Sequence, residues 1–445
     1  MKKRVIIAGA GLVGSLEAIY MAKRGFEVEV FERRPDMRNV ELAAGRSINL
    51  ALSERGWNAL KKVNVHKEVE KMAIPMYKRV MHAIDGTLTD QSYGQEGQAI
   101  YSVSRGGLNQ LLLQLASQYA NVSFNFEHKC VDVDLTTASA TFEDKNGHHH
   151  RPEADMIIGA DGAYSVIRST MMKQDRFQYS QHYIDHGYKE LTIPANKDGT
   201  HQLEKNALHI WPRGNYMLIA LPNMDGSFTC TLFFPFEGEY SFESLKTENE
   251  VFAFFKDVFP DTTNLIPNLA EDYFNNPTSS LAIMRCDPWT VKDKVLLIGD
   301  AAHATVPFYG QGMNAGFEGC FVLDQLRDEY GDNLKACFDK YSEIRKPDGD
   351  GVQDLSLHNF IVMRDKTADP KFLLQKKIEL HFSKKYPEKW LPLYSMVSFS
   401  NIRYSDAWKI GQHQDTLMQQ IMGIPNIEIK WDSKEVEDKM LKLID

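Results

Sequence analysis

The chain has 445 residues, with 51 lysines and arginines against 60 aspartates and glutamates, a net charge of −9, and 43% hydrophobic residues. This length predicts two or three globular domains, and the composition excludes a disordered, collagen-like or disulfide-stapled chain. The acidic balance also argues against a general nucleic-acid binder, which needs an excess of basic residues.

The cysteines and the apolar runs indicate where the protein is located. The five cysteines are widely spaced without a C-x-x-C pair, which favours free thiols in a reducing compartment and therefore a cytoplasmic protein. No apolar run approaches the roughly 18–20 residues of a membrane-spanning helix. The basic start followed by apolar residues also fits a signal peptide, but Gly9, Gly11 and Gly14 interrupt the apolar run, and a nucleotide-binding loop explains them better.

The first residues predict a β-strand, an α-helix and a second β-strand. Residues 3–8 form a short apolar run, residues 15–23 have helical spacing and precede Gly25, and residues 26–31 alternate like a strand. Such a βαβ unit is typical of a parallel sheet.

The turn of this unit, Gly9-Ala10-Gly11-Leu12-Val13-Gly14, matches G-x-G-x-x-G. Its glycines permit a tight turn, a close approach of a pyrophosphate and close helix packing, while the helix N-terminus favours negative charge. Glu32 ends the second strand, where a carboxylate can accept hydrogen bonds from ribose hydroxyls. The alternative is a glycine-rich turn without a ligand.

Later segments predict a divided molecule. Buried strands are predicted at 155–162 and 294–300, with a helix at 313–326; residues 216–221 and 229–234 predict an antiparallel sheet, and helices follow residue 340. We therefore expect an α/β fold, in which a Rossmann-like domain carries an inserted antiparallel-sheet substrate domain and a helical C-terminal region. The expected boundaries are 1–180 and 285–340 for the nucleotide-binding parts, 181–284 for the sheet and 341–445 for the helices.

The loop at residues 307–314 (PFYGQGMN) predicts a second contact with a cofactor. Its glycines allow the backbone to lie against a flat ring, and the helix that it opens can stabilise negative charge there. We expect His303, before this loop, to be structural. His148, His149 and His150 follow an Asn-Gly turn, which favours a solvated hairpin tip over a metal site.

Two motifs resemble those of single-component aromatic-ring flavin hydroxylases. Residues 159–168 (GADGAYSVIR) resemble the D-G motif of that family, and residues 299–303 (GDAAH) resemble its second flavin motif. The resemblance implies a Rossmann-like FAD-binding domain, with the D-G motif linked to both FAD and NAD(P)H. The FAD-binding residues that the motifs and the resemblance together imply are Gly9, Gly11, Val13, Gly14, Glu32, Arg105, Asp161, Asp300, Gly312, Met313 and Asn314.

Segments outside the flavin motifs resemble the kynurenine 3-monooxygenase family, and the match continues to about Trp408. The segments are 79–82 (RVMH), 102–109 (SVSRGGLN), 307–314 and 392–397 (PLYSMV). The resemblance implies that Arg79, Tyr93, Asn359 and Tyr394 hold the amino-acid end of L-kynurenine. A guanidinium fork suits a carboxylate, and two phenols and an amide complete a polar clamp without a competing carboxylate.

The implied activity is an NADPH-dependent flavin aromatic monooxygenase. NADPH reduces FAD, the reduced flavin captures O2 as a hydroperoxide, and L-kynurenine becomes 3-hydroxykynurenine in tryptophan degradation and NAD biosynthesis. The flavin carries the chemistry, so no catalytic side chain and no metal are expected. Pro307, Phe308, Tyr309 and Gln311 support the site, and Tyr309 occupies a position that varies in the family.

Several alternatives remain. A related hydroxylase of another aromatic acid and a non-catalytic nucleotide-binding sensor both fit the first motif. A flavin halogenase would need W-x-W-x-I-P and a disulfide reductase a redox cysteine pair, and the sequence has neither. The charged tail at 424–445 argues against a membrane anchor, and the basic stretch at 376–389 predicts a solvated helix face over a contact with a membrane or partner. NADPH against NADH and the oligomeric state, a homodimer included, are left open.

Overall fold

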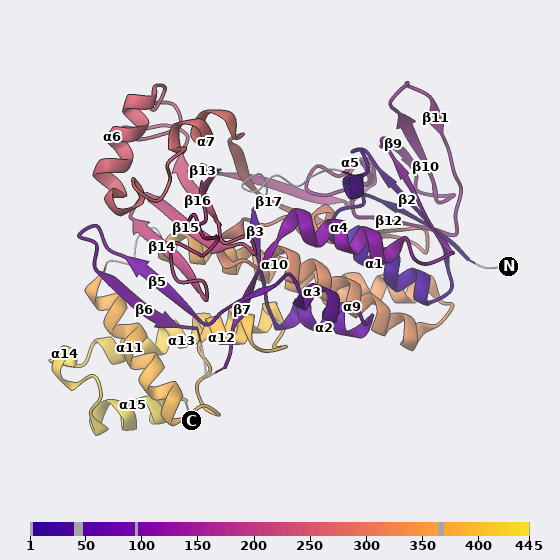
Figure 1. The fold of residues 1–445 in the computed structure, drawn as a ribbon. Coiled ribbons are helices and arrows are strands. Elements are labelled where there is room, and N and C mark those ends of the chain that lie inside the picture. The colour runs from indigo at the N-terminus through magenta and orange to yellow at the C-terminus, as the bar shows by residue number, and fades with distance from the viewer. Residues whose placement is uncertain (1–2, 40–47, 94–96, 364–368, 445) are drawn as a thin grey trace.

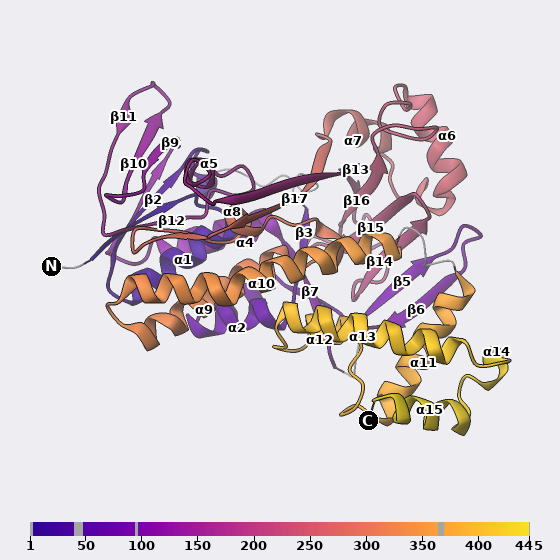
Figure 2. The same cartoon turned by 180° about the vertical axis from the view of Figure 1, so that it is seen from behind.

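The computed structural model describes residues 3–39, 48–93, 97–363 and 369–444. Two large β-sheets lie side by side, and helix α10 (Leu334–Ile361) runs from the first towards the second (Figures 1 and 2). The helices after α10 gather beside one end of the second sheet. They are α11 (Pro370–Lys385), α12 (Leu393–Ser398), α13 (Tyr404–Met422), α14 (Ile427–Lys430) and α15 (Lys434–Ile444).

The first sheet has six strands in the order β18-β19-β12-β1-β2-β8. Neighbouring strands pair in parallel except β18 with β19. The strands are β1 (Arg4–Ala8), β2 (Glu27–Glu32), β8 (Val122–Phe126), β12 (Met156–Gly159), β18 (Thr290–Val291) and β19 (Val295–Leu297). Because parallel strands end at the same edge, the residues after β1, β2, β12 and β19 are brought together there.

Helices and a small sheet cover this first sheet. Helix α1 (Leu12–Lys23) connects β1 to β2 and packs against α4 (Arg105–Ala116) and α9 (Gly312–Tyr330). A three-stranded sheet of β9 (His128–Asp134), β10 (Ser139–Asp144) and β11 (His149–His150) adds a further layer, in which Phe142 stacks on Phe31 at 3.8 Å. Such cover on a parallel sheet explains the continuous Val and Ile runs in its strands.

The second sheet has seven strands in the order β17-β13-β16-β15-β14-β5-β6. It is antiparallel except where β14 pairs with β5. Its strands are β5 (Lys78–His82), β6 (Leu88–Ser92), β13 (Gln178–Ile193), β14 (Ala207–Arg213), β15 (Tyr216–Pro222), β16 (Phe228–Pro235) and β17 (Ser279–Asp287). Two strands of this sheet, β5 and β6, thus come from residues 78–92, well before the sheet domain predicted at 181–284. The domain boundaries themselves remain predictions.

The two faces of the second sheet have different partners. On one face Trp211, Leu218 and Phe234 pack against α6 (Glu248–Val258) and α7 (Leu269–Asn275) in a closed core. The alternation of a β-strand turns their neighbours to the opposite face. There Phe233 packs on Phe308 at 4.7 Å, so this face meets the loop that precedes α9.

The remaining elements connect the two sheets. They are η1 (Met37–Asn39), β3 (Asn49–Leu52), α2 (Glu54–Lys62), α3 (His66–Glu70), β4 (Ile74–Met76), β7 (Ile100–Ser104), α5 (Val166–Met171), η2 (Pro260–Thr262), α8 (Asp300–His303) and η3 (Pro307–Tyr309). Strands β3, β7 and β4 form a small sheet of their own. None of the helices among the described residues is both long and apolar enough to cross a membrane.

The predicted elements are confirmed with shifted ends. Helix α1 starts at Leu12, three residues earlier than predicted, and Gly11, in an extended conformation, is the residue that precedes its first turn. Helix α9 continues past the predicted end at residue 326 to Tyr330, where Gly331 has a φ of +55°. The predicted hairpin tip is confirmed as well, since β10 pairs with β11 around the Asn146-Gly147 turn.

Candidate functional site

Two glycines of the turn after β1, Gly9 and Gly14, have no room for a side chain. Gly9 has a φ of +100°, and a Cβ there would lie 2.4 Å from the carbonyl oxygen of Ala160. A Cβ on Gly14 would lie 2.0 Å from the carbonyl oxygen of Gly9. Gly11 stands at the start of α1 and offers no side chain to cap its amides. The turn therefore exposes a helix N-terminus, which suits an anionic group.

Glu32 lies beside this turn at the end of β2. Its Oε2 accepts from the Ala10 amide at 2.9 Å, and its Oε1 accepts from the Arg34 amide at 3.0 Å and Nε at 2.7 Å. Burial alone would raise the pKa of Glu32, but Arg34 and the two amides outweigh burial, so the pKa falls and the carboxylate stays charged. A carboxylate has about four acceptor positions, so Glu32 can still accept from a ligand hydroxyl.

The D-G motif is organised around its own buried side chains. Asp161 Oδ2 accepts from the amides of Val166 at 2.7 Å and Ile167 at 3.3 Å, so this carboxylate caps α5. Its Oδ1 is buried without a hydrogen-bond partner among the described residues. Arg168 donates to the carbonyl of Ala301 at 2.9 Å, which fixes the D-G motif to the second flavin motif.

The second flavin motif and the first loop meet at Val13. Cβ atoms on Gly299 and Gly316 would lie 3.0 and 2.5 Å from Val13 Cγ2. Asp300, the first residue of α8, is reachable by solvent, but protein surrounds its carboxyl closely enough that burial raises its pKa, with Arg105 acting in the opposite direction. Asp300 of α8 and Arg105 of α4 therefore lie close enough to interact electrostatically.

The loop at 307–314 is fastened from both sides. Asn314 Oδ1 accepts from the Ser53 amide at 2.9 Å, and its Nδ2 donates to the carbonyls of Ala51 at 2.8 Å and Gly310 at 3.0 Å. The Asn314 amide thus shapes the loop, and the buried Met313 follows Gly312 at the start of α9. Gly310 has a φ of +68°, which only glycine adopts readily.

Three of the four predicted substrate residues lie in contact. The Arg79 guanidinium carbon lies 4.9 Å from the ring centroid of Tyr93 and 4.4 Å from that of Tyr394. The two rings stack at 5.2 Å, and Tyr309 stacks on Tyr394 at 5.6 Å. Arg79 Nε and the Tyr93 hydroxyl are buried without a hydrogen-bond partner of acceptable geometry among the described residues. Burial raises the pKa of Tyr93, so its hydroxyl remains a donor.

Asn359, the fourth predicted substrate residue, lies on α10 and contacts the loop at 307–314, whereas the other three contact one another. Its Nδ2 donates to the carbonyl of Phe308 at 2.6 Å and to Met363 Sδ at 3.2 Å.

His303 is buried against Trp289, with ring centroids 5.2 Å apart, and burial lowers its pKa to about 3. His303 is therefore neutral and packed in the interior.

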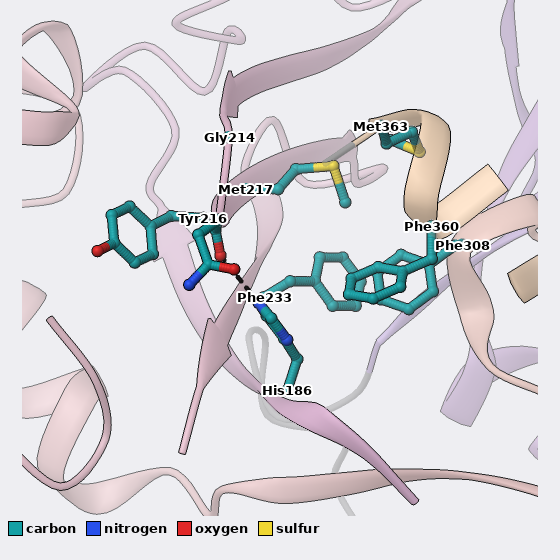
Figure 3. Close-up of a pocket in the computed structure, with 9 residues that line it drawn as sticks. His186, Gly214, Tyr216, Met217, Phe233, Phe308, Phe360 and Met363 are labelled. Atoms are coloured by element: carbon teal, nitrogen blue, oxygen red, sulfur yellow. Dashed lines mark hydrogen bonds between the residues drawn. The ribbon is translucent and has the colours of Figure 1, made fainter. Parts of the chain in front are cut away.

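An apolar wall adjoins the clamp, and most of it was not predicted. Leu208 and Ile219 are half-buried and pack both against the cluster that contains Phe308 and Phe233 and against the cluster that contains Tyr93. Figure 3 shows a pocket that Phe308 and Phe233 also line, together with His186, Met217, Phe360 and Met363. In it His186 Nε2 and the Asn215 carbonyl oxygen lie 2.9 Å apart. Strand alternation could have marked these apolar residues, but the pairing of β14, β15 and β16 was needed to place them.

Glu190 is a second residue that the sequence analysis missed. It lies on β13 opposite Thr231 of β16, and Arg105 is its nearest charged influence. Burial raises its pKa to about 7, although the main chain of Ile48 and Arg105 both act to lower the pKa. No motif marks this residue, because its strand was not predicted.

Comparisons with known proteins identify the family. The FAD binding domain family matches residues 2–356. A kynurenine 3-monooxygenase of Christiangramia forsetii is 53% identical over 100% of this chain and 99% of its own, and one of Flavobacterium psychrophilum is 54% identical over 99% and 98%. The chain belongs to the kynurenine 3-monooxygenase family.

The fold of this kynurenine 3-monooxygenase family member agrees with solved structures. A structure of 2-methyl-3-hydroxypyridine-5-carboxylic acid oxygenase superposes with a TM-score of 0.66 at 21% identity, covering 83% of this chain and 94% of that chain. The expected α/β fold, with an added sheet and a helical C-terminal region, is confirmed.

The residues of this family member fit FAD. Gly11 leaves open space at the start of α1, Glu32 is held charged at the end of β2, and the Asp300 carboxyl lies within the electrostatic influence of Arg105. A pyrophosphate, a ribose and a polyhydroxyl chain need these three kinds of group.

Proposed function

We propose that the protein is a cytoplasmic FAD-dependent monooxygenase that hydroxylates L-kynurenine to 3-hydroxykynurenine with NADPH and O2. The observation that carries the proposal is the Arg79 guanidinium held against Tyr93 and Tyr394 next to the loop that precedes α9. The five cysteines are all free and buried, which supports a reducing compartment.

Arg79 and Tyr93 bind the amino-acid end of the substrate in this proposal. The buried Arg79 Nε and the Tyr93 hydroxyl each offer a donor that the described protein leaves unused. A carboxylate satisfies both donors, and a guanidinium matches it in a planar, charge-assisted geometry. The stacked rings of Tyr93 and Tyr394 fix the direction of the guanidinium.

The apolar wall binds the aromatic end. Leu208, Ile219, Phe233 and Phe308 offer only apolar side chains to the aromatic ring of the substrate. They exclude water and orient the ring carbon that reacts. When bound, FAD supplies the redox chemistry, taking hydride from NADPH and passing electrons to O2. The start of α9 offers main-chain amides to negative charge on the cofactor.

The test compares NADPH oxidation with L-kynurenine and with 4-hydroxybenzoate. We expect L-kynurenine to stimulate oxidation and to yield 3-hydroxykynurenine, while 4-hydroxybenzoate, which lacks the amino-acid end, has little effect. Equal stimulation by both compounds, or stimulation by 4-hydroxybenzoate alone, would refute the proposed substrate.

A further inference from the structure

One wall of the proposed substrate site comes from the C-terminal region. Tyr394 lies on α12, a helix of six residues, and contacts Arg79 of β5 and Tyr309 of the loop. A helix this short has little stability of its own, so other residues must fix its position.

Arg55 holds the end of this helix. It is the second residue of α2, and its side chain is fully buried. Its Nε donates to the carbonyl of Val397 at 3.2 Å, and its Nη2 donates to the carbonyl of Met396 at 3.4 Å and to that of Ile402. The last carbonyls of a helix have no partner within the helix, so Arg55 gives the Val397 carbonyl a donor, while the Met396 carbonyl also accepts from the Ser400 hydroxyl at 2.6 Å.

The charge of Arg55 is balanced within the protein. Its Nη1 donates to Glu318 of α9 at 2.6 Å, and Glu318 also accepts from Arg345 of α10 at 2.6 Å. Burial acts to raise the pKa of Glu318, but Arg345 and Arg55 outweigh burial and the carboxyl stays ionised. These groups form a buried network that joins α2, α9 and α10 to the segment after α12.

The same arginine is linked to the loop before α9. Its guanidinium carbon lies 4.1 Å from the ring centroid of Tyr404 on α13, and the Tyr404 hydroxyl donates to Gln311 Oε1 at 2.9 Å. Gln311 directly precedes α9. Arg55 therefore contacts the segment that carries Tyr394, and it also contacts Tyr404, which is hydrogen-bonded to Gln311 of the loop.

We propose that Arg55 is a positioning residue, which holds α12 so that Tyr394 closes the substrate site against Arg79 and Tyr309. The inference rests on the proposed function, because it concerns the site for L-kynurenine. Arg55 touches neither the substrate clamp nor the glycine-rich turn. Its loss should therefore weaken substrate binding far more than FAD binding.

The test uses Arg55→Lys in the FAD-loaded enzyme. A lysine has three donors for the four acceptors that Arg55 serves, and it cannot reach them in the planar geometry of a guanidinium. We expect the Kd for L-kynurenine, measured by flavin absorbance without NADPH, to rise about tenfold, and the Kd for FAD to change less than about twofold.

Arg24→Lys is the matched control. Arg24 also contacts α9, at Asp324 and Asp328, but not the C-terminal region. Tyr404→Phe decides the question if Arg55→Lys does not fold, because it removes only the hydroxyl bonded to Gln311, and we expect the Kd for L-kynurenine to rise about fivefold. Unchanged kynurenine affinity in the variants, or equal weakening of FAD and kynurenine, would overturn the role of Arg55. A wild-type enzyme that does not bind L-kynurenine would overturn the proposed function itself.

Discussion

Arg79, whose Nε is buried, and Glu17, which is buried entirely, are ionisable residues whose surroundings lead to opposite charge states. Arg79 lies against the stacked rings of Tyr93 and Tyr394, and its Nε has no hydrogen-bond partner of acceptable geometry among the described residues. Glu17 on α1 is 1% exposed, and both carboxyl oxygens lack a hydrogen-bond partner of acceptable geometry there. The first arrangement leaves a cation ready for an anionic ligand, and the second favours a neutral acid.

Replacing Arg79 with lysine should weaken substrate binding. A lysine keeps the charge but loses the planar pair of donors and the contact of the guanidinium with the rings of Tyr93 and Tyr394. We expect the KM for L-kynurenine to rise about tenfold to a hundredfold, with a smaller change in kcat. Steady-state NADPH oxidation measures both, and Arg151→Lys, on an exposed hairpin residue, is the control. A KM like that of the control would remove Arg79 from the site.

Replacing Glu17 with glutamine should change how stability depends on pH. Burial raises the pKa of Glu17 from 4.5 to about 8, so the folded protein holds this proton more tightly than the unfolded chain does. The resulting stabilisation is full below about 4.5 and is lost as the pH rises through about 8.

As the pH rises from 6 to 9, the titration of Glu17 should therefore lower the free energy of unfolding of the wild type by about 2.5 kcal/mol. Glu17→Gln, which has no group to titrate at this position, should lack this loss. Urea unfolding at the two pH values measures the difference. Glu388→Gln, at an exposed position, should behave like the wild type. The same loss in Glu17→Gln as in the wild type would contradict a protonated Glu17.

At the scale of elements, β5 has a functional side and a structural side. Arg79 faces the site, and His82 lies in a buried chain of hydrogen bonds behind the sheet. His209 Nε2 lies 2.9 Å from the Glu204 carbonyl, which can only accept, so His209 Nδ1 must accept from His82 Nε2 at 3.0 Å. His82 Nδ1 lies 3.0 Å from Asp261 Oδ2, so the His82 ring links His209 to this carboxylate.

Two pKa shifts agree with this assignment. Burial lowers the pKa of His209 to about 4, so His209 is neutral. Burial acts to raise the pKa of Asp261, but His82 and Trp211, whose Nε1 donates at 2.7 Å, outweigh burial and lower the pKa.

Asp261→Asn should therefore destabilise the protein, because it removes the carboxylate that bonds both the His82 ring and the Trp211 Nε1. We expect the free energy of unfolding to fall by about 2–4 kcal/mol and the KM for L-kynurenine to rise, since β5 carries Arg79. Urea unfolding and steady-state kinetics measure the two effects. Asp257→Asn, which changes an exposed aspartate on the nearby α6, is the control, and equal stability of the two variants would refute a stabilising role of Asp261.

The elements also show how far sequence reasoning reaches. Strands β1 and β2 and helix α1 were predicted because their hydrophobic periods and glycines are local signals. Strand β13 was not, because its first half is polar and it pairs with β17, about a hundred residues further along the chain. The place of β5 beside β14 depends on a similarly distant pairing, which no local pattern marks.

For the whole molecule, the proposed substrate site lies where three parts of the chain meet. The first sheet and α9 carry most of the proposed cofactor residues, the second sheet carries Arg79, and the C-terminal helices carry Tyr394. The identities of these residues followed from family resemblance, and the structure brings Arg79, Tyr93, Tyr394 and Tyr309 together. The linking contacts of Arg55 could not be predicted, because they join carbonyl groups over 340 residues away.

The most direct test of the account is the origin of the oxygen in the product. Purified FAD-loaded enzyme is supplied with NADPH and L-kynurenine under oxygen-18 gas, and the product is identified by mass spectrometry. We expect 3-hydroxykynurenine that carries one labelled oxygen atom, formed only when all three substrates are present. Unlabelled product, or NADPH oxidation that yields hydrogen peroxide without hydroxylated kynurenine, would contradict a kynurenine monooxygenase.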